Sequence, residues 1–440
     1  MTWIRTLALL SSLLLPVTGM AYDLQFGEHD YGKLDALAKG MVVLHGNDNG
    51  YDPNSGAAYL FKLKYLTPDI SGFKAAAGLY VNGDLFGLTD WESEKVARGM
   101  FVDDEGDDTA QLGELYLQFK RTWFNAFGGR KLLATPLTTI SYSTIPNLYT
   151  AFGLGVEPLP KLDLAITHIT EMSFGARAMT DFGLIGEGTG SAGAAVKPST
   201  IGQAEFHSIS KIALGEDAPG TDGITVLSAV YTGVENARCQ VWDYYAYDIV
   251  NSLYLDAGYK MPLGKVHLDL GLQYLRQDDL GDELAGMVDF SLLGVKAGLS
   301  GKNWSLEGAY NTSFGDTAMF NAWGGDPAYT SSIFSRNAYR REVDAWGISG
   351  KYRIIKGLTF LASYFDYGQS DSLGAVGGVG QDLVAIDDAV ELDLSLVYRP
   401  PQVKGLMLKT FYAQRTSEYN GSNGYDLTQD QWRVVVAYGF

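Results

Sequence analysis

The chain has a single cysteine, Cys239, and lacks the residue patterns of common cofactor, metal and catalytic sites. One cysteine excludes an internal disulfide framework. The Gly-rich stretch "GAVGGVGQ" (374–381) lacks the Gly-Lys-Ser/Thr ending of a phosphate loop, no Gly-x-Ser-x-Gly elbow occurs, and the five histidines have no metal-site spacing. The sequence therefore predicts neither a cofactor nor a metal, and it gives no positive signal for an enzyme.

A basic surface and long hydrophobic runs are missing as well. The formal net charge of −18 argues against nucleic acid as a partner, because phosphates require a basic footprint. Beyond the N-terminus, no stretch approaches the roughly 18 apolar residues of a membrane-spanning helix. Hydrophobic residues nevertheless make up 46% of the chain, so they must be dispersed.

The first 21 residues have the organisation of a secretory signal peptide. Arg5 provides a positive n-region, residues 7–17 form a short apolar region, and Gly19-Met20-Ala21 is a small-residue cleavage site. The apolar region is too short to span a bilayer. We therefore expect residues 1–21 to be removed and residues 22–440 to form one exported domain that begins at Tyr22.

Apolar and polar residues alternate along segments of roughly ten residues from about position 33 onward. In "VELDLSLVYR" (390–399), the apolar side chains fall on one face and the polar ones, such as Glu391 and Asp393, on the other. A period of two indicates half-buried β-strands. No sustained helical period is visible.

The C-terminal stretch "QWRVVVAYGF" (431–440) gives the most specific pattern. As a strand, it places Trp432, Val434, Val436, Tyr438 and Phe440 on one face. Aromatic residues at both ends of an aliphatic stripe are typical of a lipid-facing strand, because aromatic rings prefer the two membrane interfaces. Phe440 would then lie at an interface.

Short and long connections alternate between these segments. The long ones are residues 84–109, 134–147, 173–202, 315–341 and 368–387. Transmembrane barrels show this alternation, with tight periplasmic turns and long extracellular loops. We predict an all-β, antiparallel transmembrane barrel of about 18 strands with inward-folded extracellular loops. A secreted β-sandwich or propeller is the soluble alternative, but no blade-length repeat is visible.

The polar faces of the strands would line the lumen of such a barrel. The inward-reading cations are Lys62, Lys64, Lys120, Arg130, Lys351, Arg353, Lys409, Arg415 and Arg433, and the carboxylates opposing them are Glu114, Asp269, Glu391 and Asp393. Basic residues on one wall of a narrow lumen would attract anionic groups. In a wide lumen the same residues would be solvated charges without a guiding role.

Four stretches resemble the OprD-type substrate-preferring porins of Gram-negative outer membranes. They are "GGRKLLATPLTTISYSTIPNLYTAF" (128–152), "AWGGDPAYTSS" (322–332), "GKYRIIKGLTFLASYFDYG" (350–368) and "VYRPPQVKGLMLKTFYAQR" (397–415), together with the closing strand. The resemblance covers nearly the whole chain after the signal peptide, in order and in spacing.

The resemblance implies an 18-stranded barrel whose third and seventh extracellular loops, residues 134–147 and 315–341, form a constriction. It also implies a ladder of basic residues that guides carboxylate-bearing nutrients, and a terminal Phe440 that the barrel-assembly machinery reads. The constriction residues would be Ser141, Ser143, Asp326, Tyr329 and Ser331. Ser141 and Ser143 stand where the family carries a basic residue, and Lys409 stands where it carries a lumen arginine.

The acidic stretch "FVDDEGDD" (101–108) gathers five carboxylates. Hard cations prefer oxygen ligands, but this spacing is not that of an EF-hand. We interpret it as a solvated extracellular loop, with divalent bridging to lipopolysaccharide as the alternative.

The leading hypothesis is a passive outer-membrane channel for small hydrophilic solutes, with some preference for carboxylate-bearing nutrients or amino acids. A non-selective or cation-selective porin is the first alternative. A barrel enzyme is the second, with His168 as its one candidate residue, and an energy-coupled plugged transporter is the third. The expected partners are outer-membrane lipid, lipopolysaccharide and the assembly machinery. A monomer and a trimer both remain open.

Overall fold

A computed structural model describes most of the chain. The described residues are 22–26, 29–47, 54–93, 96–97, 100–103, 106–139, 144–173, 175, 205–215, 217–321, 323–325, 327–334, 340–370, 386–419 and 425–440. The strands are β1 (Tyr22–Phe26), β2 (His29–Asn47), β3 (Ser55–Leu66), β4 (Phe73–Asp84), β5 (Thr109–Lys120), β6 (Phe124–Lys131), β7 (Leu148–Leu159), β8 (Leu162–Ser173), β9 (His207–Ser208), β10 (Ile224–Tyr231), β11 (Ala237–Ala246), β12 (Val250–Leu263), β13 (Val266–Asp279), β14 (Asp289–Ser300), β15 (Trp304–Phe314), β16 (Asp344–Ile355), β17 (Leu358–Tyr367), β18 (Ile386–Tyr398), β19 (Leu406–Tyr419) and β20 (Tyr425–Gly439).

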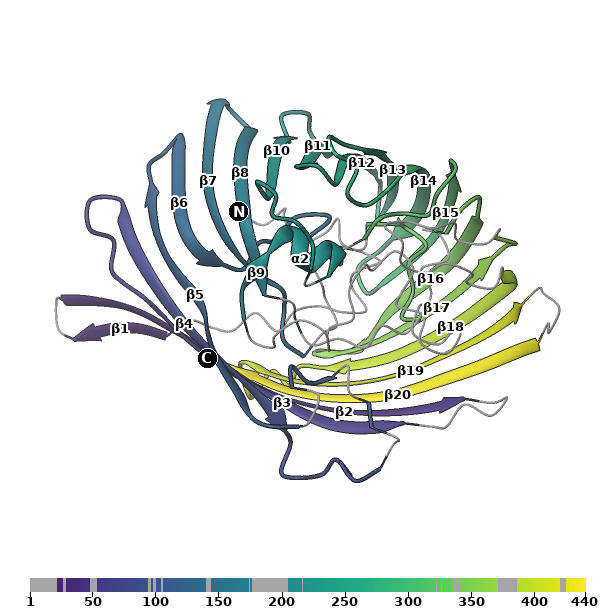
Figure 1. Cartoon of the computed structure of the whole chain (residues 1–440). Coiled ribbons are helices and arrows are strands. Elements are labelled where there is room, and N and C mark those ends of the chain that lie inside the picture. Colours follow the sequence, from purple (N-terminus) through teal and green to yellow (C-terminus); the bar gives the residue numbers. More distant parts are fainter. Residues whose placement is uncertain are drawn as a thin grey trace.

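Eighteen of these strands, β2–β8 and β10–β20, form a closed antiparallel barrel (Figure 1). Consecutive strands pair, and β8 pairs with β10 across the long connection between them. The ring closes where β20 pairs with β2, and the backbones of Ala36 and Phe440 exchange two hydrogen bonds, at 2.8 and 3.0 Å. The predicted fold class is confirmed.

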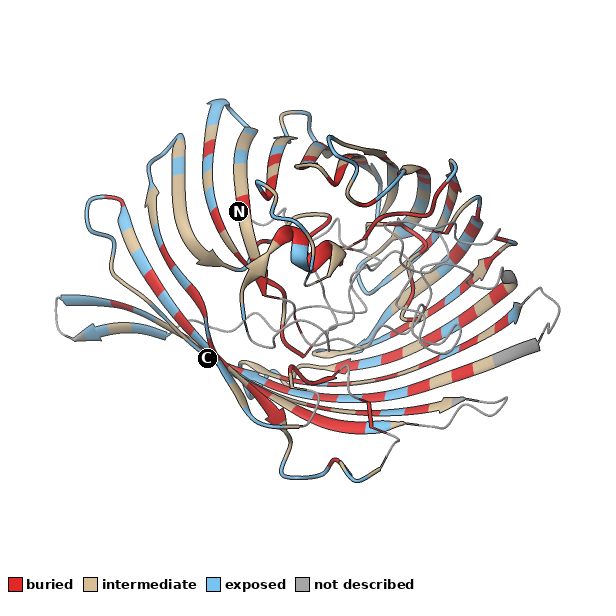
Figure 2. Ribbon diagram, in the orientation of Figure 1, coloured by how far each residue is buried: buried red, intermediate tan, exposed pale blue. Residues whose placement is uncertain are grey.

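Alternating burial along the strands separates an outer from an inner face (Figure 2). On β20, Trp432, Val434 and Val436 are exposed, whereas Arg433 and Val435 are buried. Apolar side chains exposed on the outside and polar ones on the inside are what a strand between lipid and an aqueous lumen requires. The alternation predicted for the last strand is therefore present.

The two ends of the barrel differ in their connections. Turns such as Pro160-Lys161 and Gly264-Lys265 close one end, which we call the short-turn end, and the connections after β4, β6, β8, β15 and β17 lie at the other, the long-loop end. At the short-turn end, the φ of +89° at Gly357 lets the turn pass against the backbone of Arg399, where a side chain would clash. Such positive φ values are accessible to glycine at no steric cost.

Aromatic side chains mark both ends of the outer face. On β11–β16, Tyr245, Tyr310 and Trp346 are exposed toward the long-loop end, and Tyr259 and Tyr352 toward the short-turn end. Leucine, isoleucine and valine dominate the exposed surface between them. Two aromatic girdles around an aliphatic band are the outer surface expected of a barrel in a bilayer.

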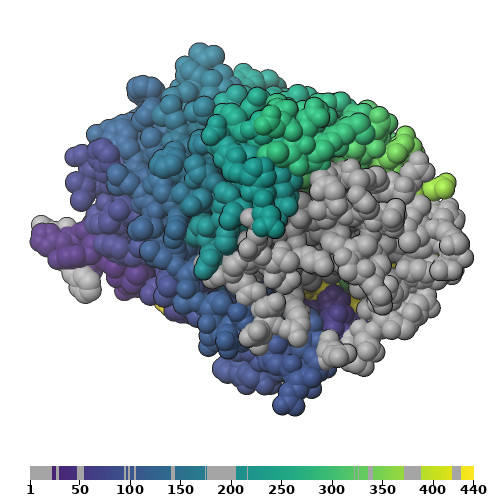
Figure 3. Space-filling model, in the orientation of Figure 1, coloured from purple at the N-terminus to yellow at the C-terminus, as the bar shows by residue number. Residues whose placement is uncertain are grey.

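Two elements depart from the simple barrel. β1 pairs with the first residues of β2 and forms a hairpin that projects from the body of the molecule, in purple in Figures 1 and 3. The short helix α2 (Ile209–Leu214) lies inside the ring of strands, and its Ile209 and Ile212 are buried. The sequence had given no sign of this helix. No helix in the described part of the chain is long and apolar enough to cross a membrane.

Candidate functional site: the lumen

Loop 7, the connection between β15 and β16 (residues 315–343), is attached to the inner wall at β12 and β13. The Tyr329 hydroxyl donates to Asp256 Oδ2 at 2.6 Å, and the Tyr329 amide donates to Gln273 Oε1 at 2.9 Å. Burial and the adjacent Asp256 carboxylate raise the pKa of the Tyr329 hydroxyl, so it remains a neutral donor. The loop is thereby held in the lumen.

The same loop is also attached to the wall at β17 and β18. Glu391 accepts hydrogen bonds from Ser332 Oγ at 2.6 Å and from the Phe334 amide at 2.8 Å. The Tyr367 hydroxyl donates to the Thr330 carbonyl at 2.7 Å. Because its attachment points lie on strands several positions apart in the ring, loop 7 crosses the lumen.

Loop 3, the connection between β6 and β7 (residues 132–147), meets loop 7 inside the barrel. The Gly325 amide donates to the Leu137 carbonyl at 3.0 Å, and Asn147 Nδ2 donates to the Trp323 carbonyl at 2.9 Å. A side chain at position 325 would clash with the Leu137 backbone, so glycine allows this close approach. Tyr244 of β11 donates to Thr135 Oγ1 at 2.9 Å and ties loop 3 to the wall.

An apolar core fixes both loops from within. Trp323 and Phe320 of loop 7, Leu137 of loop 3 and Ile212 of α2 belong to one buried cluster with lumen-side residues of the wall, among them Leu275. Burying such side chains stabilises by about 1.5–3 kcal/mol each. Loops 3 and 7 are thus packed parts of the interior, as the predicted inward folding requires.

Three cations form a column on the inner wall of β19, β20 and β2. We call Lys39, Lys409 and Arg433 the basic column. Lys39 is opposite Ala437 and Lys409 is opposite Val435, so the three occupy successive levels spaced by two residues, about 7 Å, along the strands. The column climbs from the short-turn end toward the loops.

Aromatic and amide groups hold the column. The Phe411 ring lies 4.9 Å from Lys409 Nζ and 4.9 Å from Arg433 Cζ. Arg433 Nη2 donates to Gln431 Oε1 at 2.7 Å. Lys409 and Arg433 are only 7% and 6% exposed. Lys409 lies close enough to Arg433 and Lys39 to be repelled by them, and close enough to Asp393 to be attracted by it. The column therefore gathers three basic residues on one side of the lumen.

Further charges extend the column at both ends. Above it, the buried Arg415 is opposite Glu391 in the register, and the buried Asp393 lies two residues along the same face. Below it, Lys351 and Arg353 of β16 lie near Arg399, and burial lowers the pKa of the Arg399 guanidinium. The structure therefore brings the predicted residues of the last five strands together on one wall.

The predicted cations of β3–β6 have different surroundings. Lys62 Nζ lies 2.7 Å from Asp35, and Lys64 Nζ lies 2.6 Å from Glu114, which also accepts from the Tyr80 hydroxyl at 2.8 Å. Lys120 is exposed at the end of β5. These residues do not join the basic column.

Arg130 is a separate case. The register pairs it with Leu115, whose side chain is exposed on the outer face, but the preceding Gly129 has a φ of +123°. The Arg130 guanidinium lies 4.2 Å from the centre of the Phe206 ring, which packs against lumen-side residues such as Leu60. Arg130 thus lies at the start of loop 3, away from the column.

Of the predicted constriction residues, two lie in the described part of loop 7 and three lie outside the described residues. Tyr329 anchors loop 7, and the Ser331 amide donates to the Ala328 carbonyl within the same loop. Ser141, Ser143 and Asp326 lie outside the described residues. Among the described residues, no cluster of three or more potential metal ligands is present.

Sequence reasoning missed Lys39, Arg399 and Asp256. Lys39 stands in "LDALAKGMVVL", where both faces of the strand are largely apolar, so alternation gave it no contrast. Its position opposite Ala437 shows that it faces the lumen. That position is known only when β20 is known to pair with β2.

Residues 189–440 match the profile of the outer membrane porin, OprD family. Solved structures with the same fold include OccK9 (OpdG), OccK2 (OpdF) in complex with glucuronate and OpdK with vanillate, all of Pseudomonas aeruginosa. OccK9 is 15% identical with a TM-score of 0.74 (92% of this chain, 98% of that chain), and OccK2 is 16% identical with a TM-score of 0.69 (93% and 98%). OpdK is 15% identical with a TM-score of 0.68 (92% and 98%). No curated protein sequence matches the chain.

Proposed function

Because the chain belongs to the OprD family of outer membrane porins, we propose that the basic column makes it a passive channel preferring small carboxylate-bearing solutes. The observation that carries this proposal is the stacking of Lys39, Lys409 and Arg433 on one wall of the lumen. Loops 3 and 7 narrow the lumen and bring solutes within reach of that wall.

Electrostatics supports the preference. Two unit charges 4 Å apart attract by about 1 kcal/mol in bulk water and by about 4 kcal/mol at the effective dielectric of a protein surface. A low-dielectric wall around narrow water focuses such fields. Three cations at successive levels would let a carboxylate pass from one to the next without a deep energy minimum.

Two of the structural neighbours were solved with vanillate and with glucuronate. Both ligands carry a carboxylate. The likeness is of fold alone, so it supports the proposed class of solute without naming the solute of this chain.

Liposome swelling with matched solutes tests the proposal. Small carboxylates should enter faster than neutral sugars of equal size, and a reversal potential in a salt gradient should show anion preference. Equal rates would support a non-selective porin. Preference for cations would instead point to the acidic loops at the mouth, in keeping with the net charge of −18.

We propose further that the long-loop end faces outward and that residues 1–21 are a cleaved leader. Phe440, exposed at the closure, would be recognised by the barrel-assembly machinery, and an interface position independently favours an aromatic residue. Phe440→Asp should reduce surface assembly at native expression, and normal assembly would contradict this. One chain encloses the whole lumen, so the pore is complete in a monomer or in a trimer.

A further inference from the structure

A polar cavity opens on the outer face of the barrel, where no part of the lumen reaches. It has a volume of about 440 Å³ and is lined by His168, Thr170, Thr221, Asp222 and Tyr247. Pockets that bind small molecules commonly measure about 300–1,000 Å³. Every lining residue has a polar group, which is unusual for a surface that continues into lipid.

Strand alternation fixes the outward direction of this cavity. His168 is opposite Phe152 on one side and Thr225 on the other, and Phe152 and the nearby Ile166 and Leu227 are all exposed on the outer face. Directly opposite residues of an antiparallel pair point to the same face. His168 therefore points away from the lumen.

The cavity lies at the level of the girdle nearest the long-loop end. Tyr245 is opposite Thr225 and its ring packs edge-on against Tyr247 at 4.9 Å. Toward the short-turn end, the same strands continue into exposed aliphatic residues such as Val241. Tyrosine at this position has an apolar body in the lipid and a polar tip in the headgroup layer.

The polar groups of the cavity are partly preorganised. His168 Nδ1 lies 3.0 Å from Thr225 Oγ1, which lies 3.1 Å from the Tyr247 hydroxyl. This series of hydrogen bonds orients the imidazole of His168. The second ring nitrogen of His168 and the carboxylate of Asp222 make no hydrogen bond to a described residue, so both can serve a ligand.

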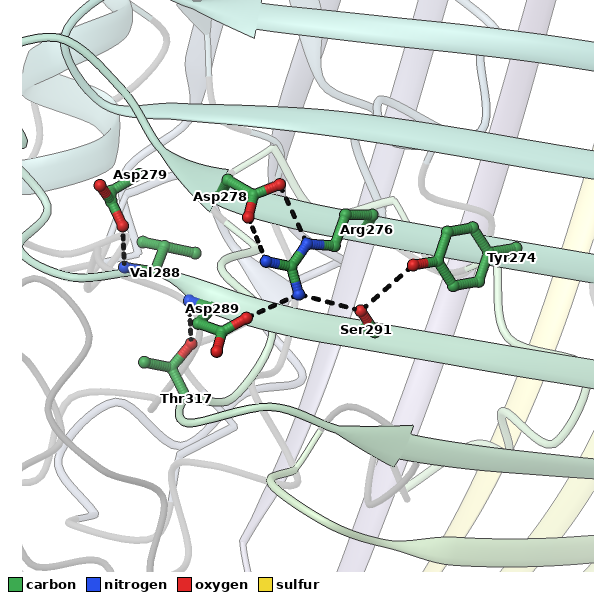
Figure 4. A network of polar contacts seen from close by, with 8 residues as sticks. All are labelled: Tyr274, Arg276, Asp278, Asp279, Val288, Asp289, Ser291 and Thr317. Atoms are coloured by element: carbon green, nitrogen blue, oxygen red, sulfur yellow. Dashed lines mark hydrogen bonds and ion pairs between the residues drawn. The ribbon is translucent and has the colours of Figure 1, made fainter.

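The surrounding charge selects against phosphate. Asp222 lines the cavity, and Asp243 and Asp278 follow on the outer face of the next strands. The outward cation nearby, Arg276, is already bound by Asp278 and by Asp289, the latter at 2.6 Å (Figure 4). A phosphate would meet net negative charge, whereas sugar hydroxyls can donate to a carboxylate and accept from or donate to an imidazole.

We propose that this cavity binds a saccharide unit of an outer-leaflet glycolipid, the sugar of a lipopolysaccharide headgroup, through Asp222, His168 and the Tyr247 ring. The proposal rests on the outward orientation of the long-loop end given under the proposed function. It does not depend on the solute preference of the lumen. The bound lipid would hold the barrel at a fixed depth in the outer leaflet.

Native mass spectrometry of the full barrel in detergent tests this, with dephosphorylated lipid A disaccharide as the probe. Asp222→Asn and His168→Ala should each weaken binding by about ten-fold, the effect of losing one or two hydrogen bonds to charged or polar groups. The matched control is Asn251→Ala, because Asn251 is opposite Tyr245 on the same outer level but does not line the cavity. It should bind like the unaltered protein.

The proposal is overturned if both cavity variants bind the probe normally, or if Asn251→Ala loses as much. If only the phosphorylated lipid binds, the cavity is a phosphate site. If the disaccharide without its acyl chains binds equally well, the ligand is a soluble saccharide. Either result contradicts a glycolipid saccharide site. Conductance, measured in the same preparations, should be unchanged in the variants. A barrel that fails to conduct would count against the proposed function and not against the cavity.

Discussion

The cations of the lumen differ between its two walls. On β3–β5 and β11–β15, five of them (Lys62, Lys64, Arg238, Lys260 and Lys296) lie 2.6–3.7 Å from a carboxylate. On β19 and β20, Lys409 and Arg433 of the basic column lie against the Phe411 ring, and Arg433 donates to Gln431. The first wall pairs these cations with carboxylates one by one, whereas the column gathers three cations near Asp393.

The number of lumen cations alone therefore does not determine whether a wall attracts anionic solutes. The potential of a cation about 3 Å from a carboxylate falls off more steeply with distance than that of a single charge, because the two opposite charges increasingly cancel. The Phe411 ring beside Lys409 and Arg433 carries no net charge that would cancel that of either cation. Substitutions on either wall can test this contrast.

Removing the column should have the largest effect. Lys39→Gln, Lys409→Gln and Arg433→Gln together should lower carboxylate permeability at least about ten-fold, since each charge contributes on the order of 1 kcal/mol and the terms do not fully add. Liposome swelling would measure it, with neutral sugars as the internal control.

The loss should shrink as salt rises, because the screening length is about 10 Å at 0.1 M. If carboxylate and sugar rates fall in equal proportion at every salt concentration, the substitutions have changed the pore size and the column has no guiding role.

Unbalancing the paired wall should have a smaller effect of opposite sign. Glu307 is 3.6 Å from Lys296, and Glu307→Gln would leave that cation without its carboxylate while preserving volume. Carboxylate permeability should rise about three-fold, the effect of roughly 0.7 kcal/mol. No rise in carboxylate conductance would mean that solutes do not approach this wall.

Releasing loop 7 should sharpen the contrast by widening the path between the walls. Tyr329→Phe with Ser332→Ala removes hydrogen bonds to Asp256 and Glu391. Each contributes about 1 kcal/mol, so the mean conductance should rise about two-fold with more current noise, and selectivity should fall.

Single-channel recording would measure this. Ser349→Ala is the matched control, because Ser349 bonds to Ser363 within the wall and leaves the loop untouched. A control that is as noisy as the double variant would show that the wall, and not the loop attachment, sets the current.

The smallest effect is expected where both members of a pair are neutralised. Lys64→Gln with Glu114→Gln removes no net charge, and the carboxylate-to-sugar ratio should stay within a factor of about two. A ten-fold change in that ratio would mean that paired cations guide solutes as well, and the distinction between the walls would fail.

The barrel was predictable because its signal is local and repeated. Most strands carry their own alternation, as Trp432 to Phe440 illustrate, and most short turns carry a glycine or a proline. The side of the strand on which a residue lies follows from alternation alone. For this reason Lys409, Arg415 and Arg433 were identified as lumen residues.

The arrangement within the lumen was not predictable in the same way. Which cation meets which carboxylate depends on the register between strands far apart in sequence, as with Lys64 and Glu114. Lys39 lacked polar neighbours to mark its face, and Asp256 became visible only through Tyr329, whose loop crosses the barrel. Helix α2 is too short to show a helical period.

The pair of hydrogen bonds between Ala36 and Phe440 has a consequence for biogenesis. It joins the first barrel strand to the residue that follows the last barrel strand, so the ring cannot close before β20 has been synthesised. Until then, β2 and β19 each present an unpaired edge, and such edges recruit other chains. Contacts this distant in sequence also form slowly. The polypeptide must therefore remain unfolded and shielded until it reaches the membrane. A copy shortened by a single strand would be an open sheet with aggregation-prone edges, and not a smaller channel.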